Sequence, residues 1–267
     1  QSDLSHQWIW EDVREMDADG YAFSIRQPKP MESIAIAAQK HTELVKLAPS
    51  TTPAGLTLDP FPTPDTGQPG NARSHAIRAA YYSAAFLLQR ILADELDVDP
   101  SEIEVADLAP RDLPDHTRVA DIILADELPN GSGFVRELHT RLRDLLPKAL
   151  NSQDPVNFMK AVFADAHRES CLDSCYDCLR VYRNMNYHGL LDWRLGVSML
   201  RLMQEPDHRA GADGSFIAPE LEDWSVLVNA QAEQIAGNFQ GIERSTITLG
   251  NIQVPVLRTP LRHFLIV

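Results

Sequence analysis

All three cysteines of the 267-residue chain fall within one short stretch, at Cys171, Cys175 and Cys178. Gaps of three and two residues allow thiolates to reach one soft metal ion, and zinc is the metal that such clusters commonly hold. An odd number of cysteines also argues against a disulfide framework. The spacing therefore predicts a zinc knuckle.

A structural zinc site takes four ligands in a tetrahedron, so three cysteines leave one position to fill. His188 follows Cys178 by a gap long enough to loop back, and it is the fourth ligand that we expect. His167 lies one helical turn before Cys171 and is the second choice, provided that the helix continues. Glu169 and a water molecule are two further candidates. Carboxylates are rarer in structural thiolate sites, and water would leave a catalytic-type position.

The alternative to a structural zinc is a catalytic zinc, which makes more specific demands on the surrounding residues. Zinc deaminases combine a His-x-Glu motif, whose Glu is the general acid and base, with a Cys-x-x-Cys motif. Residues 167–169 match the first motif and Cys175 to Cys178 match the second. However, Ser174 stands where the signature has proline, the two halves are too close together, and Cys171 would be a surplus thiolate. These departures argue against a deaminase, so no residue is assigned a catalytic role.

The formal net charge of -14 argues against a simple DNA-binding module, because such modules are usually basic. Residues 165–201 differ, since five arginines there balance five acidic residues. We therefore expect any local basic face in this segment, and the candidates for contact with a DNA backbone are Arg180, Arg183 and Arg194. The competing role for these cations is to support a site of three thiolates and one Zn²⁺, whose net charge is about -1.

The composition is that of a soluble globular protein, with 44% hydrophobic and 23% charged residues. No apolar run of about 18 residues predicts a transmembrane helix, and the N-terminus lacks the basic and apolar regions of a signal peptide. Three cysteines without an export signal favour a reducing compartment, so we expect a cytoplasmic protein without a membrane partner. The missing initiator Met and a strand-like C-terminus favour a fragment of a longer chain.

Hydrophobic periodicity predicts the elements that position these residues. The clearest helix spans residues 72–95, where apolar side chains recur at i, i+3, i+4 and i+7. The glycine turn before residue 134 predicts a helix with Ser132 as N-cap and not a phosphate site, because Asp126 and Glu127 would repel a phosphate. The same patterns predict helices from Pro155 into the cysteine cluster, at 189–204 and at 221–239, and strands at 21–25, 44–47, 103–105, 120–124 and after residue 240.

This order of elements predicts an α+β fold, in which helices pack on a mixed sheet and a Cys3His zinc knuckle is inserted. Six prolines within residues 49–70 exclude regular structure there and predict an exposed loop. We expect a zinc-binding domain over residues 1–205 and an extension of one helix and several strands over residues 206–267.

The residues after the cysteines extend the pattern beyond a generic knuckle. The stretch from Cys171 to Arg194 resembles the zinc-binding C-terminal domain of MrfA-type helicases, and the order of elements over roughly residues 20–205 is similar to that family. The four-cysteine version of the domain has a cysteine where this chain has Glu169. The chain is more similar to a three-cysteine branch of the family, whose pattern includes the histidine found here as His188. That branch includes helicase-like and companion subunits of the DISARM antiphage system. The motif residues are Cys171, Ser174, Cys175, Tyr176, Asp177, Cys178, Leu179, Arg180, Tyr182, Asn184, His188, Leu191, Asp192, Trp193 and Arg194.

The resemblance implies a zinc-stabilised accessory domain of an ATP-dependent DNA helicase-like protein in antiphage defence or DNA repair. Such a domain would help to shape the DNA path or a subunit contact. The sequence contains no Walker motif, so ATP would bind a motor domain outside this chain. A second hypothesis is a non-enzymatic companion subunit that binds a helicase partner, and a zinc hydrolase or deaminase is a remote third.

Overall fold

The structure is a computed structural model, and it describes residues 16–17, 20–21, 40–61, 72–151, 153, 157–259 and 263–265. The chain divides into two compact units, residues 1–39 and residues 40–267. In the first unit, the strands β1 (Met16–Asp17) and β2 (Gly20–Tyr21) pair antiparallel. The strand predicted at 21–25 overlaps β2 at Tyr21, and its remaining residues lie outside the described part of the chain.

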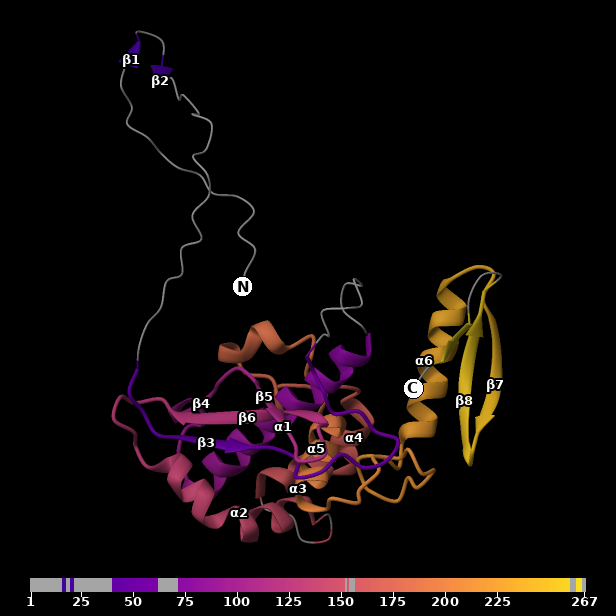
Figure 1. The fold of residues 1–267 in the computed structure, drawn as a ribbon. Coiled ribbons are helices and arrows are strands. Elements are labelled where there is room, and N and C mark those ends of the chain that lie inside the picture. Colours follow the sequence, from indigo (N-terminus) through magenta and orange to yellow (C-terminus); the bar gives the residue numbers. More distant parts are fainter. Residues whose placement is uncertain are drawn as a thin grey trace. The chain divides into compact units, whose positions relative to one another are not determined.

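An antiparallel sheet centred on β6 forms one layer of the second unit (Figure 1). Its strands are β3 (Leu44–Leu47), β4 (Ile103–Val105), β5 (Ala109–Asp112) and β6 (Arg118–Asp126). Val45 of β3 and Val105 of β4 both pair with Leu124, so these two strands flank β6 on opposite sides. The strands predicted at 44–47, 103–105 and 120–124 are confirmed. Every described pairing is antiparallel, which refines the expected mixed sheet.

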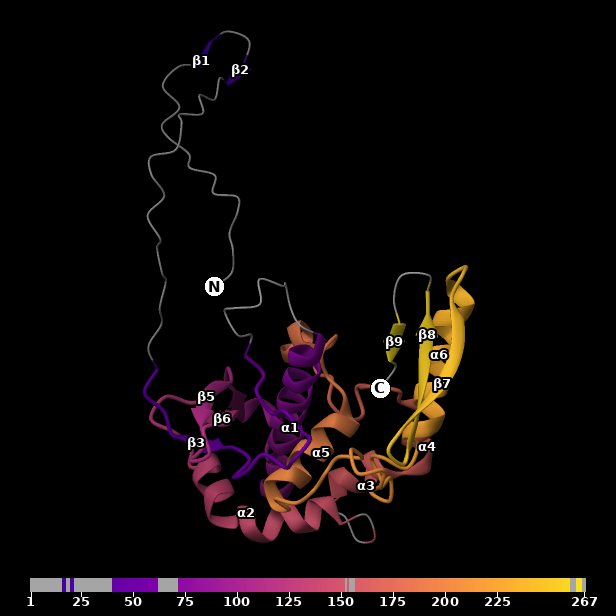
Figure 2. The same ribbon diagram turned by 45° about the vertical axis from the view of Figure 1, so that its right-hand side comes forward.

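Helices pack on this sheet, which confirms the α+β class (Figure 2). Their bounds are α1 (Ala72–Leu96), α2 (Phe134–Leu150), α3 (Asn157–Phe163), α4 (Asp165–Ser170) and α5 (Trp193–Gln204), with 3-10 turns η2 (Pro100–Glu102) and η3 (Tyr182–Tyr187). In the described part of the chain, none of the helices combines the length and the apolar character that crossing a bilayer requires.

The helix predicted at 72–95 is α1, and it is the central element of the core. Its Tyr81 is fully buried and its hydroxyl joins three elements. The Tyr81 hydroxyl donates to the Leu58 carbonyl at 3.1 Å and accepts from the Ala120 amide of β6 at 3.2 Å. Burial raises the pKa of Tyr81, so the phenol stays protonated and donates at neutral pH. Through this hydroxyl, α1 fixes both β6 and the proline-rich segment, whose described residues 49–61 form no helix or strand.

The turn between β6 and α2 is organised by a carboxylate. Asp126 is fully buried, and its Oδ2 accepts from the amides of Ser132 at 2.7 Å and Gly133 at 2.6 Å, while its Oδ1 accepts from the Val135 amide at 3.0 Å. Gly133 is the N-cap, with a φ of 86° and no side-chain cap. The prediction that Ser132 caps α2 is therefore wrong. An aspartate of the chain itself occupies the anion position at this helix start.

The helix predicted to run from Pro155 into the cysteines is divided in two. Ala164 adopts an extended conformation, with φ of -62° and ψ of 139°, and separates α3 from α4. The next predicted helix begins at Trp193, later than expected, because the Asp192 side chain accepts from the amides of Arg194 and Leu195 and caps α5.

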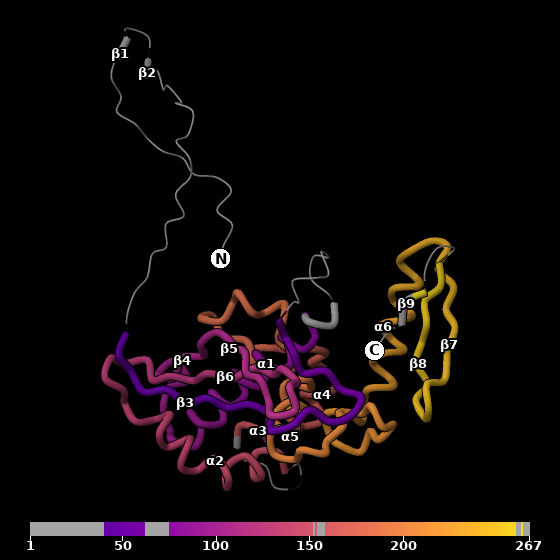
Figure 3. The backbone as a smooth tube through the Cα atoms, in the orientation of Figure 1, coloured from indigo at the N-terminus to yellow at the C-terminus, as the bar shows by residue number. Residues whose placement is uncertain are grey.

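The C-terminal segment contains the predicted helix and strands. They are α6 (Trp224–Asn238), β7 (Glu243–Leu249), β8 (Ile252–Arg258) and β9 (His263–Leu265), and the strands form an antiparallel sheet in that order. Figure 3 follows the backbone through this segment. The buried Glu220 before α6 binds Arg201 of α5 through two contacts of 2.8 and 3.0 Å. A domain boundary at 205/206 stays a prediction.

A close contact between helices joins α1 and α5. A Cβ atom at Gly196 would lie 2.8 Å from the carbonyl carbon of Ser83 and 2.9 Å from Leu87 Cδ1. Ser83 Oγ also accepts from the Asp192 amide at 2.8 Å, which fixes the start of α5 on α1. Only glycine fits between the two helices at this position.

We predict that Gly196→Ala destabilises the protein by about 1–3 kcal/mol in urea unfolding, because a methyl group must push apart two packed helices. Helix propensity alone would give the opposite sign, a gain of about 1 kcal/mol. Gly189→Ala is the matched control, since a Cβ there meets no atom within 4 Å. A stabilised Gly196→Ala variant would contradict the close contact.

Candidate metal centre

Four potential ligands converge at one point of the second unit. One donor atom each from His167, Cys171, Cys175 and Cys178 lies within 4.8 Å of all the others. The Cys178 sulfur lies 3.8 Å from that of Cys171 and 3.7 Å from that of Cys175. A tetrahedral site with Zn–S bonds of about 2.3 Å has sulfur–sulfur edges of about 3.8 Å. The spacing of the sulfurs therefore suits zinc.

The local backbone explains how the cysteines meet. Cys171 follows directly after α4, where its amide donates to the His167 carbonyl at 2.8 Å. The Cys175 amide donates to the Cys178 sulfur at 3.1 Å, and the Arg180 amide donates to the Cys175 carbonyl at 2.8 Å. These bonds close a tight turn that points both of its sulfurs inward.

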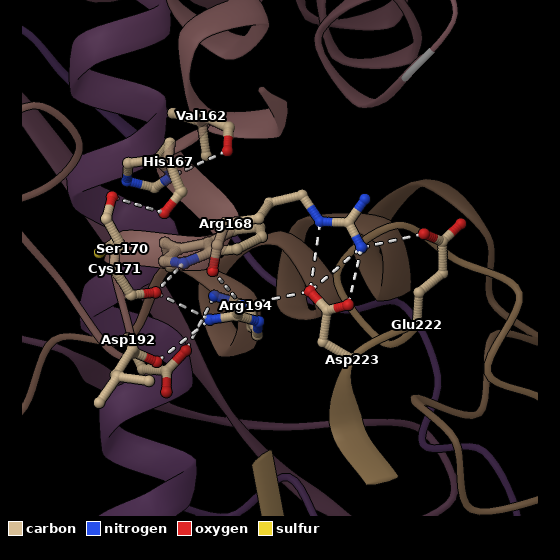
Figure 4. Close-up of polar contacts among 11 residues, drawn as sticks. Val162, His167, Arg168, Ser170, Cys171, Asp192, Arg194, Glu222 and Asp223 are labelled. Atoms are coloured by element: carbon tan, nitrogen blue, oxygen red, sulfur yellow. Dashed lines mark hydrogen bonds and ion pairs between the residues drawn. The ribbon is translucent and has the colours of Figure 1, made fainter. Parts of the chain in front are cut away.

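His167 presents one nitrogen to this cluster. Its Nδ1 lies 2.8 Å from the Val162 carbonyl, which can only accept, so Nδ1 carries the proton (Figure 4). Its Nε2 is buried and has no hydrogen-bond partner among the described residues. The ring packs against Trp193 with centroids 5.6 Å apart. A histidine whose second nitrogen donates to a carbonyl is the usual form of a zinc ligand.

His188, the fourth ligand that the sequence favoured, is not a member of this group of donors. Its Nε2 lies 3.0 Å from the Val181 carbonyl and 2.9 Å from Asn184 Oδ1, and its ring meets the edge of Tyr176. The structure thus places His188 where it holds η3 onto the knuckle. Glu169 is exposed and is not a member of the group either.

Burial controls the charge of the thiols. Cys171 and Cys178 are almost fully buried, and burial raises the pKa of both thiols, that of Cys178 to about 11. The Coulombic effect of Cys178 raises the pKa of Cys171 further. Thiolates can therefore form here near neutral pH only beside a positive charge, which a zinc ion supplies.

Arg194 forms the scaffold around the cluster. Only 8% of the residue is exposed, and its guanidinium lies 4.4 Å from the centroid of the Trp193 ring. It donates to the carbonyls of Cys171 and Leu172 at 3.1 Å each and to the carbonyl of Arg168 at 3.2 Å (Figure 4). Because it binds three carbonyls at once, Arg194 fixes the path of the chain into the knuckle.

The same network joins the knuckle to the segment before α6. Arg168 Nη2 donates to Glu222 at 2.9 Å and to Asp223 at 3.1 Å, and Asp223 also lies 3.5 Å from Arg194 (Figure 4). The sequence did not reveal the link between Arg168 and these acids, because more than fifty residues separate them. The only indication of this link in the sequence was the equal number of arginines and acidic residues in residues 165–201.

The three arginines considered for DNA contact have different surroundings. Arg194 is occupied in the scaffold, so its guanidinium is not free to bind a DNA phosphate. Arg180 is partly buried, with its Nε 2.9 Å from Ser174 Oγ and its Nη2 3.2 Å from Asp173. Arg183 is exposed, and its charge attracts Asp99, although it forms no ion pair within 4.0 Å of any residue that the structure describes.

Comparison with known proteins agrees with this geometry. Over 107 residues, the chain is 29% identical to Druantia protein DruE from Escherichia coli (strain UMEA 4076-1). The matched stretch covers 40% of this chain and 5% of DruE. The chain therefore corresponds to a small part of that relative. No solved structure matches the chain. The family model of the MrfA Zn-binding domain matches residues 84–179, from within α1 through the last cysteine, and includes His167 but not His188. Residues 84–179 are thus similar to an MrfA Zn-binding domain.

Proposed function

We propose that this chain is a zinc-stabilised accessory module of an ATP-dependent, DNA-processing helicase-like protein in bacterial defence. The observation that supports it best is the unpartnered Nε2 of His167 beside three converging thiols. In this proposal, zinc is bound by Cys171, Cys175, Cys178 and His167, in place of His188. The ion has a structural role, because four protein ligands fill a tetrahedron and leave no position for water or substrate.

The surroundings of the ligands support a structural role as well. A deaminase needs a glutamate beside the metal as general acid and base, but Glu169 is exposed and stands apart from the donor atoms. Cys171 and Cys178 belong to the hydrophobic core together with Trp193. Zinc binding would therefore be part of folding, as it is in small zinc modules.

The link to defence rests on the similarity to Druantia protein DruE and on the resemblance to DISARM subunits. Because the chain lacks Walker motifs, ATP binding would belong to a motor outside it. The net charge of -14 supports a second version of the proposal, in which the chain is a companion subunit held by a basic partner. Light scattering of the chain mixed with a helicase motor tests that version, and absence of a complex would remove it.

A zinc test separates the two histidines. We expect His167→Ala and Cys178→Ser to lose the bound zinc, because each removes a donor from a closed tetrahedron, and to lower the melting temperature by about 10 °C or more. His188→Ala should keep its zinc. Metal content per chain after dialysis, measured by plasma mass spectrometry, and thermal unfolding followed by circular dichroism give the two readouts.

The reverse pattern, with zinc kept in His167→Ala and lost in His188→Ala, would assign His188 as the ligand. Wild-type protein that keeps its full melting temperature after the metal is removed by a chelator would exclude a structural zinc.

A second test concerns DNA. We expect Arg183→Gln to weaken binding of a single-stranded oligonucleotide by the zinc-loaded chain about two- to fivefold, and to reduce the salt slope by about 0.7, because one phosphate contact is lost. Fluorescence anisotropy over a range of salt concentrations measures both quantities. Arg143→Gln on α2 is the matched control, since Arg143 is also exposed. Equal losses in both variants would mean diffuse attraction and would remove the DNA contact, but not the zinc, from the proposal.

A further inference from the structure

A large cavity in the described part of the chain lies outside the metal centre. It has a volume of about 1010 Å³ and is formed by the C-terminal half of α1, the η2–β4 segment and η3. Ligand pockets typically range from about 300 to 1,000 Å³, so this one can take an extended segment with several side chains.

Negative charge dominates its lining. Two of its carboxylates, Glu104 and Glu127, already face Lys40, whose Nζ lies 2.5 Å and 3.8 Å from them. Asp94 and Asp97 form no ion pair with any described residue, and Asp94 Oδ2 accepts from the Phe158 amide at 3.1 Å. Asp99 accepts from the Ser101 amide at 2.7 Å and is attracted by the charge of Arg183. The lining contains five carboxylates, Asp94, Asp97, Asp99, Glu104 and Glu127, and two guanidiniums, Arg90 and Arg183. Phosphate would be repelled here, and a cation would be attracted.

The end of α1 adds to this field. A helix C-terminus carries a partial negative charge that basic residues in the last turn usually offset. The last turn of α1 contains no basic residue, and Asp94 stands in it instead. Asp97 follows in the left-handed region with a φ of 54°, where it is exposed. The helix end and its aspartates therefore add their fields at the same wall of the cavity.

The wall formed by η3 contains two tyrosines beside Arg183, and it is held by the zinc knuckle. Tyr182 and Tyr187 of η3 line the cavity, and Tyr182 is 84% exposed. Asn184 fixes η3, since its Oδ1 accepts from the Val181 amide at 2.9 Å and its Nδ2 donates to the Leu179 carbonyl at 2.9 Å. Aromatic faces bind guanidinium and ammonium groups. His188, through its contacts with Val181 and Asn184, is thus a positioning residue for this wall.

We propose that this cavity binds an arginine or lysine side chain of an extended segment from a protein partner, held between Asp97 and the aromatic wall of η3. The inference rests on the proposed function for the nature of the partner, which is the motor part of the helicase-like assembly. Single-stranded DNA is the competing ligand, because Arg183, the candidate phosphate contact, lies in the same lining. Five carboxylates against two guanidiniums disfavour DNA inside the cavity.

The test uses a fluorescein-labelled hexa-arginine peptide, the neutral hexacitrulline peptide and a labelled twelve-residue oligothymidylate with the zinc-loaded full chain. We expect the arginine peptide to bind at least about tenfold more tightly than the citrulline peptide, as measured by anisotropy. Asp97→Asn should weaken arginine binding about fivefold, because it removes one facing charge. Asparagine also tolerates the left-handed region, so the variant should fold.

Asp144→Asn, at an exposed aspartate of α2, removes the same charge elsewhere and should change the affinity less than about twofold. Equal losses in the two variants, or equal binding of both peptides, would overturn the inference. Oligothymidylate that binds more tightly to Asp97→Asn than to Asp144→Asn would also overturn it, because only an anion gains from losing the Asp97 charge. Zinc binding by the ligand residues does not depend on Asp97, so the zinc measurements on His167→Ala and Cys178→Ser distinguish a failure here from a failure of the proposed function.

Discussion

The convergence of three thiols and one imidazole on a single point is the constraint on which the surrounding structure depends. Protonated thiols are weak hydrogen-bond donors, and three thiolates within 4.8 Å would repel one another strongly. Neither form explains why Cys171 and Cys178 are buried in the core beside the unpartnered nitrogen of His167. A divalent cation resolves both problems, because it neutralises the thiolates and binds the nitrogen.

Around this point, the chain is held by a few buried polar groups. Arg194 binds three carbonyls of the path into the knuckle, and Asp192 caps the helix that carries Arg194. Gly196, close behind in the same helix, allows that helix to approach α1 closely. The five residues from Asp192 to Gly196 therefore have several roles. Asp192 caps the helix, Trp193 packs in the core, Arg194 binds backbone carbonyls and Gly196 permits the close contact with α1. This explains why α5 and the metal centre form one structural unit although the family match ends at residue 179.

The sequence was sufficient where a signal is local and repeated. The apolar periodicity of α1, the short apolar runs of β4 and β6 and the spacing of the cysteines all predicted elements that the structure contains. Prediction was weaker where one contact decides. His167 reaches the thiols through a break at Ala164 and a bond to Val162, which no periodicity reveals. The cap of α2 was missed because its acceptor, Asp126, lies before the glycine turn.

The net charge of the chain, in contrast, indicates a binding surface only once the positions of the acidic residues in the structure are known. Asp126 and Asp192 bind backbone amides at helix starts, and Glu220 is buried against Arg201, so these carboxylates contribute little to the outer surface. Several acids without ion pairs among the described residues collect instead at the end of α1, beside a wall that the knuckle positions. A charge of -14 therefore does not act as a uniform field. Because interactions between exposed charges are screened beyond about 10 Å, a partner responds to this local concentration of acids and much less to the total.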